Sequence, residues 1–201
     1  MKKMDPKYII ELTLKLCATC LIVAGLLGVV NMVTAPNIAA INKAKTEAAM
    51  KAVVEDAENS TFSEPLEITD AMKEAAASAG GSVTEAYEVQ VGGAAAGHAL
   101  KIVASGSQGS IEMMVGLDTE GAVTGVSVVK NAETAGIGSK VMENEPNSKG
   151  VGVLDQFIGK SAAGGTLNVG SNVDAITGAT VSTKGITAGV NAAIAVAGVM
   201  G

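Results

Sequence analysis

The chain has 201 residues, of which 48% are hydrophobic, and its formal net charge is −6. This length suits one domain of ordinary size plus one membrane element and leaves no room for a second full domain. The acidic balance provides no basic stripe that could neutralise phosphates, so it argues against nucleic acid as a partner. We therefore expect the partners to be proteins or a membrane.

The first element is an uncharged run from Leu16 to Pro36. At a rise of ~1.5 Å per residue, a helix of this length nearly matches a hydrocarbon core of ~30 Å. We therefore predict a single transmembrane helix over residues 16–36, with the lipid bilayer as a direct partner. The alternative is a cleaved signal peptide ending at Val33-Thr-Ala35, but Pro36 after the cut and the length of the apolar run disfavour cleavage.

The lysines on either side of this run bear on its orientation. Four precede it and three follow it closely: Lys2, Lys3, Lys7 and Lys15, then Lys43, Lys45 and Lys51. Because lysine concentrates on the cytoplasmic side of a span, the small excess predicts a cytoplasmic N-terminus over residues 1–15. The chain would then be a single-pass protein of the cell (inner) membrane with its domain outside.

Two cysteines, Cys17 and Cys20, lie one helical turn apart near the start of the run. A structural zinc ion needs four ligands, and the single histidine of the chain is His98, so we expect the two thiols to act as small apolar residues. His98 lies alone in a strand pattern, where we expect a structural role. No metal site is predicted.

The domain begins with helices and continues with strands. Helical periodicity predicts a helix from Asn37 to about Glu58, residues 59–67 are predicted to form a loop, and Thr69 is predicted to cap a short Ala-rich helix. Antiparallel strands are then predicted over residues 86–91, 97–104, 111–117 and 122–129, with turns at Gly92-Gly93 and Asp118–Gly121. Phe157, one of the few aromatic residues, is predicted to lie in the core.

The C-terminal stretch is predicted to be a helix that packs on this sheet. Its apolar residues recur on one helical face: Ile186, Val190, Ala193, Ile194 and Ala197. The uncharged run from Gly185 to Gly201 raises the possibility of a second transmembrane span. Asn191 and a length below ~20 residues count against it. The predicted fold class is α+β, with one transmembrane helix and one extracytoplasmic domain built on a mainly antiparallel sheet packed by helices.

Two stretches of the domain have residues suited to binding chemistry. In Asn131-Ala-Glu-Thr-Ala-Gly-Ile-Gly138, Glu133 and Thr134 offer an acceptor and a hydroxyl beside a Gly-rich bend, which suits the polar edges of a ligand. The alternative is that Thr134 only caps a helix that follows. The second stretch runs from Asp174 to Thr183.

In the second stretch, Thr177 and Thr180 flank Gly178 and Ala179, so a ligand can approach the backbone closely between two hydroxyls. Ser182 or Thr183 is predicted to cap the helix that follows, whose positive N-terminal end favours an anion such as a phosphate. The alternative is an ordinary strand-to-helix turn, because hydroxyl-bearing residues and glycine are common at helix starts.

The string Asp174-x-x-Thr-Gly-Ala-Thr180 resembles the attachment motif of the covalent-FMN family, which includes the G subunit of the Rnf complex and the C subunit of the sodium-pumping NADH:quinone oxidoreductase. The resemblance implies that FMN is joined through its phosphate to the hydroxyl of Thr180. The earlier stretch resembles the family's His-x-Glu-Thr-Pro-Gly-Leu-Gly loop, from which it departs at Asn131, Ala135 and Ile137.

The same resemblance implies a set of site residues. Those expected to contact the covalent FMN are Thr177, Gly178, Ala179, Thr180, Val181, Ser182, Glu133, Thr134, Gly136 and Ile137. A separate flavin transferase is expected to recognise Asp174, Gly178 and Ala179 during maturation. No catalytic residue is expected in the chain, because it carries no P-loop, no dinucleotide-binding fingerprint and no Ser/His/Asp set.

The compact length and single anchor look more like an Rnf G subunit than a quinone-reductase C subunit. The implied function is a membrane-anchored electron-transfer subunit, inactive alone, in a complex that couples ferredoxin:NAD⁺ electron transfer to Na⁺ or H⁺ transport. Its partners would be the other membrane subunits. We expect a helical linker region over residues 37–84 and the FMN-binding domain over residues 85–201. The competing interpretations are the quinone-reductase subunit, a pilin-like structural protein and a membrane-tethered anion-binding module.

Overall fold

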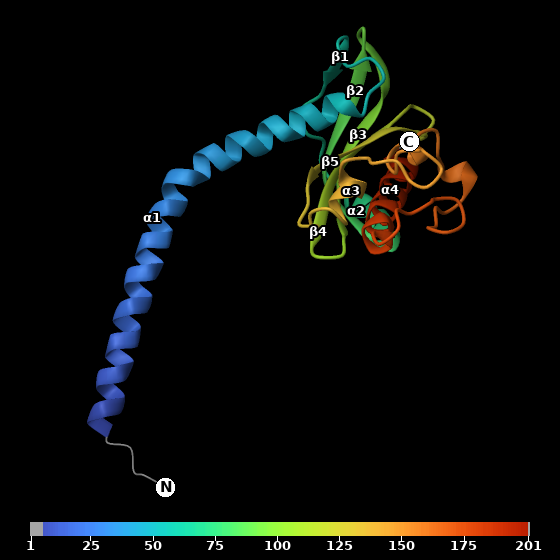
Figure 1. The fold of residues 1–201 in the computed structure, drawn as a ribbon. Coiled ribbons are helices and arrows are strands. Elements are labelled where there is room, and N and C mark those ends of the chain that lie inside the picture. Colours follow the sequence, from blue (N-terminus) through green and yellow to red (C-terminus); the bar gives the residue numbers. More distant parts are fainter. Residues whose placement is uncertain (1–5, 201) are drawn as a thin grey trace. The chain divides into compact units, whose positions relative to one another are not determined.

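A computed structural model describes residues 6–200 of the chain, and it divides after Ala44 into two compact units. The first unit is helical, and the second combines a five-stranded sheet with helices (Figure 1), so the predicted α+β fold class is confirmed. The residues predicted to form the cytoplasmic N-terminus lie partly outside the described part, including Lys2 and Lys3.

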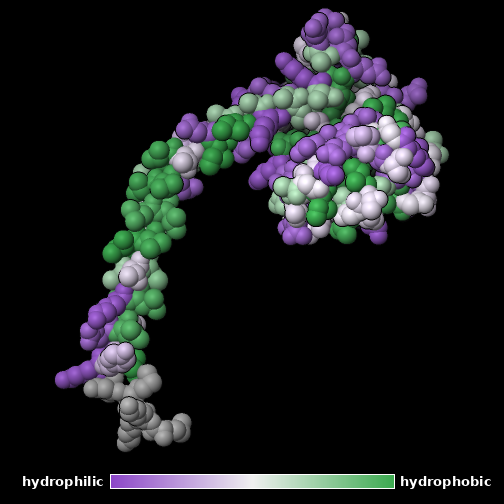
Figure 2. Space-filling model, viewed as in Figure 1, coloured by the Kyte–Doolittle hydropathy of each residue, from purple (hydrophilic) through white to green (hydrophobic). Residues whose placement is uncertain are grey.

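Helix α1 (Pro6–Ala52) contains the predicted transmembrane segment. It continues through Pro36 without a break and ends at Ala52, earlier than the predicted end near Glu58. Large apolar side chains are exposed along it, and Figure 2 shows them as a hydrophobic stretch. They include Leu21, Ile22, Val23, Leu26, Leu27, Val29, Val30, Met32 and Val33. By length and composition α1 is able to cross a membrane.

The sheet is an antiparallel meander in the order β1-β2-β3-β4-β5. The four predicted strands are present, with wider bounds for three of them: β2 (Gly81–Val91), β3 (Ala94–Ser105), β4 (Ser110–Leu117) and β5 (Val123–Lys130). The glycines in the two predicted turns have positive φ: Gly92, Gly93 and Gly121. These turns connect sequential strands, as predicted from the sequence.

The prediction of a loop over residues 59–67 was wrong in part, because β1 (Ser60–Phe62) lies within it. Its pairing with the far end of β2, where Ser60 faces Val91, creates this short edge strand. A stretch of this length has no alternation that would indicate a strand. The next element was predicted well, because Thr69 caps α2 (Asp70–Ser78) by accepting a hydrogen bond from Met72 N at 3.3 Å.

One face of the sheet is covered by α2 and by α4 (Thr180–Met200), which together with the loops bury the main core (Figure 1). The predicted apolar face of α4 is confirmed, since Ile186, Val190 and Ala193 are fully buried. More than half of the most apolar window of α4 is buried inside the domain, so this helix serves as a core helix. A second membrane span is not needed to explain its composition.

The segment between β5 and α4 has little regular structure. It contains α3 (Ser139–Met142) and two 3₁₀ turns, η1 (Asp155–Phe157) and η2 (Ala162–Gly164). Phe157 has no exposed surface, which confirms its predicted place in the core. Both stretches with residues suited to binding chemistry lie at the borders of this segment.

Candidate functional site

The predicted attachment turn, residues 174–180, leads directly into α4. Gly178 has a φ of +86°, a conformation that L-residues with a side chain rarely adopt, and open space surrounds the position of a Cβ there. Ala179 is buried, whereas Thr177 and Thr180 are both exposed. The turn therefore presents two hydroxyls on an open surface, one of them at the first residue of a helix.

The prediction that Ser182 or Thr183 caps α4 was wrong, because the helix begins earlier, at Thr180. Thr183 N already donates to Ala179 O at 3.0 Å, so both predicted capping residues lie inside the first turn. Thr183 Oγ1 donates to the same Ala179 carbonyl at 3.0 Å. The first N–H groups of a helix have no acceptor within it, so they can serve as donors to an anion beside Thr180.

Glu133, in the stretch from Asn131 to Gly138, is connected to the first turn of α4. Its Oε2 accepts a hydrogen bond from Ser182 Oγ at 2.5 Å, in the first turn of α4. Its Oε1 accepts from the backbone N–H of Ser107 at 2.7 Å and of Gln108 at 3.2 Å, in the turn between β3 and β4. One half-buried carboxylate therefore connects three segments that are far apart in the sequence.

Two glycines allow this carboxylate to fit. A Cβ on Gly138 would collide with Glu133 and would lie 2.8 Å from Ser182 Oγ, and a Cβ on Gly106 would collide with Glu133 from the other side. These contacts give Glu133 a structural role, and its contact with FMN stays a prediction. Both of its oxygens already accept hydrogen bonds from the chain, so the structure favours a role in positioning α4.

The alternative assignment for Thr134, a side-chain cap of the following helix, was wrong. The residue before α3 is Gly138, and no side-chain hydrogen bond caps this helix. Thr134 uses its carbonyl oxygen, which accepts from Ile137 N and Ser139 N, both at 3.2 Å. Its side chain is exposed. Gly136 has a φ of +77°, which explains why glycine suits this bend.

Two apolar side chains near Thr180, the predicted attachment residue, are exposed. Ile137 is 50% exposed and Val181 is 57% exposed. Val181 precedes Ser182 and Ile137 precedes Gly138, where an added Cβ would lie 2.8 Å from Ser182 Oγ, so the two exposed side chains come from adjoining segments. This apolar surface next to Thr180 suits the edge or face of a flavin ring.

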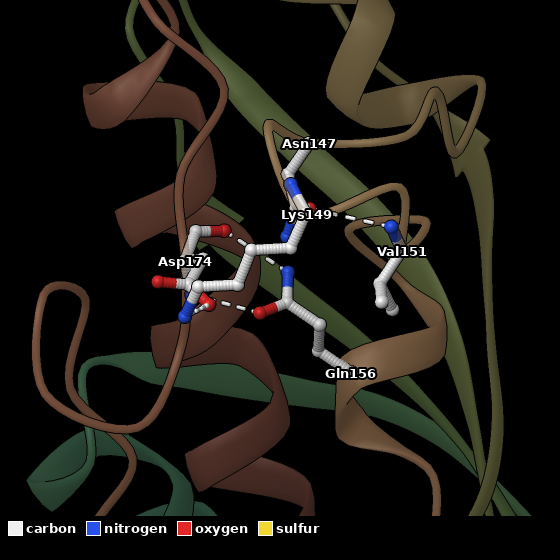
Figure 3. A network of polar contacts seen from close by, with 5 residues as sticks. All are labelled: Asn147, Lys149, Val151, Gln156 and Asp174. Atoms are coloured by element: carbon white, nitrogen blue, oxygen red, sulfur yellow. Dashed lines mark hydrogen bonds and ion pairs between the residues drawn. The ribbon is translucent and has the colours of Figure 1, made fainter.

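The beginning of the attachment turn is held by a polar network (Figure 3). The side-chain amide of Gln156 binds the backbone of Asp174 twice: its Nε2 donates to Asp174 O at 3.0 Å, and its Oε1 accepts from Asp174 N at 2.8 Å. Lys149 Nζ forms an ion pair with Asp174 Oδ2 at 2.7 Å. Both the backbone and the carboxylate of Asp174 therefore have partners within the chain.

The loop that carries Lys149 is itself anchored. Asn147 is only 8% exposed, and its Oδ1 accepts from Lys149 N at 2.8 Å and from Val151 N at 3.3 Å (Figure 3). The local sequence of this loop indicates only a solvated surface. Lys149 and Gln156 escape detection from the sequence because they meet Asp174 only through the folding of segments 25 and 18 residues away.

A groove of about 810 Å³ runs along a neighbouring face of α4, where Lys184, Thr187 and Asn191 line it together with residues 165–169. Neither Thr180 nor Glu133 lines this groove. The two predicted stretches therefore meet on an open part of the surface and not inside this groove.

The residues at the start of α4 fit FMN. Thr180 offers an exposed hydroxyl, the first helical N–H groups offer donors to a phosphate, and Ile137 and Val181 offer an apolar surface. The chain has two Tyr, two Phe and no Trp, so the ring would not be enclosed by several aromatic side chains. Within residues 6–200, no group of three or more His, Cys, Asp or Glu residues is placed to hold a metal ion.

Comparison with known proteins agrees with this geometry. Residues 106–195 match the family model of the FMN-binding domain, and Glu133 and Thr180 both lie within this matched range. FMN is thus the cofactor of this domain, and the antiparallel hairpin of β4 and β5 belongs to the matched region.

Two relatives match nearly the whole chain, and a third matches about half of it. The G subunit of the Na(+)-translocating ferredoxin:NAD(+) oxidoreductase complex of Acetobacterium woodii is 30% identical over 96% of this chain and 94% of the relative. The G subunit of the proton-translocating ferredoxin:NAD(+) oxidoreductase complex of Clostridium ljungdahlii is 27% identical, with the same 96% and 94% coverage. The G subunit of an ion-translocating oxidoreductase complex of Aliivibrio fischeri strain MJ11 is 29% identical over 54% of this chain and 52% of the relative. This chain therefore belongs to the family of G subunits of the Rnf-type ion-translocating oxidoreductase complexes.

Proposed function

We propose that the chain is the membrane-anchored subunit that carries FMN as a phosphoester of Thr180 in a complex coupling ferredoxin:NAD⁺ electron transfer to Na⁺ or H⁺ transport. The observation that carries the proposal is the placement of Thr180. It is exposed at the first residue of α4, in an Asp-x-x-Thr-Gly-Ala-Thr turn whose helix is tied to the Glu133 loop by the Ser182 hydroxyl. The names of the relatives supply the reaction and the complex.

The attachment would be made by a separate, Mg²⁺-dependent flavin transferase with FAD as the donor. Thr180 Oγ attacks the phosphorus of the FMN half, a new Oγ–P bond forms, the pyrophosphate P–O bond breaks, and AMP leaves. The hydroxyl proton passes to a base of the transferase, because no described residue of this chain is hydrogen-bonded to Thr180 Oγ. The product is a singly charged phosphodiester at the helix start, where the first N–H groups stabilise an anion.

The deciding experiment is flavin fluorescence of the denatured protein on a gel, with the modified peptide mapped by mass spectrometry. Wild type and Thr177→Ala are expected to keep the flavin, and Thr180→Ala is expected to lose it. Thr177 is the matched control because it is also exposed and lies in the same turn. Flavin retained in Thr180→Ala would contradict the assignment, and flavin lost from denatured wild type would contradict covalent attachment.

We also propose a single-pass topology, with residues 16–36 in the bilayer, the N-terminus in the cytoplasm and the FMN domain outside. The exposed apolar side chains of α1 and the lysine excess before this segment support it. Ser148 is exposed in the loop after Asn147, so a Ser148→Cys variant that also lacks Cys17 and Cys20 offers a single labelling site. An impermeant maleimide should label it in intact cells. Labelling only after the membrane is broken would reverse the orientation.

The other interpretations are not favoured by the comparisons. The three relatives are all G subunits, and the matched domain is a flavin domain. The division of the chain into a linker region over residues 37–84 and an FMN-binding domain over residues 85–201 stays a prediction. So does the absence of a metal at Cys17 and Cys20, for which double replacement with Ala should leave the flavin content unchanged.

A further inference from the structure

The attachment turn is fixed at its two ends by independent contacts. At the Asp174 end, the Gln156 amide holds the backbone and Lys149 holds the carboxylate (Figure 3). At the Thr180 end, the hydroxyl of Ser182 is bound to Glu133. These two sets of contacts share no residue, so a change at Lys149 leaves the position of Thr180 in place.

The two partners of Asp174 differ in exposure. Gln156 is half-buried and precedes the fully buried Phe157. The Lys149 side chain is 67% exposed and that of Asp174 is 44% exposed. An exposed ion pair contributes little to stability and exchanges easily, whereas the backbone of Asp174 stays fixed.

We propose that Lys149 restrains maturation by competing with the flavin transferase for the carboxylate of Asp174. The inference rests on the proposed function and on the expectation, implied by the family motif, that the transferase recognises Asp174 before Thr180 Oγ attacks the FMN phosphorus of FAD and AMP leaves. In this proposal a cationic or hydrogen-bonding group of the transferase replaces the Lys149 ammonium at Oδ2. Gln156 keeps the backbone in place during this exchange, so the exchange changes the binding of the domain and not the chemistry at Thr180.

The proposed competition predicts that a change at Lys149 alters the KM for the chain and leaves kcat unchanged. Apo full-length chain in detergent, made in cells without a transferase, is titrated against purified transferase with FAD and Mg²⁺, and the initial rate of covalent flavin incorporation is measured. Lys149→Met should lower the KM for the chain about two- to five-fold, as expected for release of an exposed ion pair, with an unchanged kcat. Lys149→Arg keeps a cation and should behave as wild type.

Two further variants test whether the effect passes through Asp174. Lys140→Met removes the cation of another exposed pair, with Glu145 at 3.8 Å, and should leave the KM unchanged. Asp174→Asn should raise the KM, and adding Lys149→Met to it should have no further effect, because the two residues act as one unit.

The outcomes separate the inference from the proposed function. A KM that is unchanged or raised in Lys149→Met, or a Lys149→Met effect that persists beside Asp174→Asn, overturns the role of Lys149. Those results leave Thr180 as the attachment residue if Thr180→Ala takes up no flavin in the same assay. Flavin incorporated into Thr180→Ala contradicts the proposed function itself. If wild type incorporates no flavin, both the proposed function and the role of Lys149 are contradicted.

Discussion

The two faces of the sheet are covered in different ways. One face carries α4 and most of the core, including fully buried Leu100, Ile102 and Ile186. The opposite face carries a smaller cluster, in which Ala49, Met50 and Val53 at the end of α1 pack on the strands. The helix that begins at Thr180, the proposed attachment residue, is thus part of the main core, whereas the residues at the end of α1 pack on the sheet through a local contact.

Glycines make both contacts close. Toward α4 they lie on both partners: a Cβ on Gly185 of the helix would lie 2.5 Å from Ser105 O, and a Cβ on Gly81 of β2 would lie 2.7 Å from Ala192 Cβ. Toward the end of α1, they are on the strands, where Gly116 faces Gly125 across β4 and β5 and the backbone of Val53 fills the space above them. Thr124 Oγ1 adds a hydrogen bond to Val53 O at 2.6 Å.

This difference indicates what each contact does. Burial of α4 fixes Thr180 relative to the sheet, so a flavin attached there, as proposed, would be positioned by the main core. The contact at Val53 involves few residues, so it can be weakened while the flavin site stays intact. Substitutions on the two faces test this contrast, from the largest expected effect to the smallest.

The largest effect is expected for Ile186→Ala on the α4 face. Ile186 has no exposed surface, and removal of a buried Ile side chain leaves a cavity, so the free energy of unfolding should fall by ~2–5 kcal/mol. Chemical denaturation followed by circular dichroism measures it. Val199→Ala, on the same helix at 46% exposure, should stay within about 0.5 kcal/mol of wild type. Similar losses in both variants would contradict the buried face of α4.

A smaller loss is expected for Gly116→Ala on the opposite face. The new Cβ would collide with Val53 O and lie 2.5 Å from Thr124 Oγ1, and overpacking of this kind costs ~1–3 kcal/mol. Because the contact is local, protease should cut more readily near residues 53–59 while covalent flavin is retained.

The matched control is Gly164→Ala, because nothing lies within 4 Å of its added Cβ. Unchanged protease sensitivity in Gly116→Ala would show that the end of α1 does not depend on this glycine pair.

Substitutions of Glu133 distinguish its role in holding α4 in place from the effect of its negative charge on the flavin. Glu133→Ala leaves Ser107 N, Gln108 N and Ser182 Oγ without their acceptor and should cost ~1.5–3 kcal/mol. In Glu133→Gln one oxygen still accepts and the amide can donate to Ser182, so the loss should be at most about 1 kcal/mol.

Redox titration of the flavin-loaded Glu133→Gln variant tests the charge. Reduction adds negative charge to a flavin, so removal of a nearby carboxylate charge should raise the reduction potential without removing the cofactor. An unchanged potential would restrict Glu133 to holding α4 in place.

The smallest effect is expected at the margin of the smaller cluster, where Tyr87 is only partly buried. There Glu85 accepts hydrogen bonds from Tyr87 OH at 2.6 Å and Lys101 Nζ at 2.9 Å. Burial raises the pKa of Glu85, but these two hydrogen bonds outweigh it, so the pKa lies below its ordinary value of 4.5. Burial and the bond to Glu85 raise the pKa of Tyr87 well above its ordinary value of 10.0.

The sign of each shift sets its pH window. The Glu85 contribution is present above about pH 4.5 and is lost as pH falls through the lowered pKa, whereas the Tyr87 contribution is present below about pH 10 and is lost as pH rises. Glu85→Gln should therefore cost less than about 1 kcal/mol at pH 7, and wild type should lose this advantage on acidification. Parallel denaturation curves of both proteins at pH 7 and about pH 3 measure it. A constant difference would contradict the assignment.

The sequence predicted the fold class and most of the elements because its signals were local. Alternation marked the four long strands, glycines marked the turns, and a 3.6-residue period marked the buried face of α4. The incorrect predictions concern elements whose presence or bounds depend on strand pairing or on packing. β1 pairs with the edge of β2, and the hydroxyl of Ser182, predicted as a cap, donates to Glu133 from inside the first turn of α4.

By itself, the sequence determined the apolar anchor, the antiparallel sheet, the FMN family and the turn around Thr180, since each follows from residue types at fixed short spacing. Only the tertiary structure decided how the turn is held. Glu133 reaches Ser182 across 49 residues, and Lys149 and Gln156 reach Asp174 across 25 and 18. No local pattern encodes these contacts, because hydrogen bonds depend on distance in space, which the packing of α4 and η1 on the sheet sets.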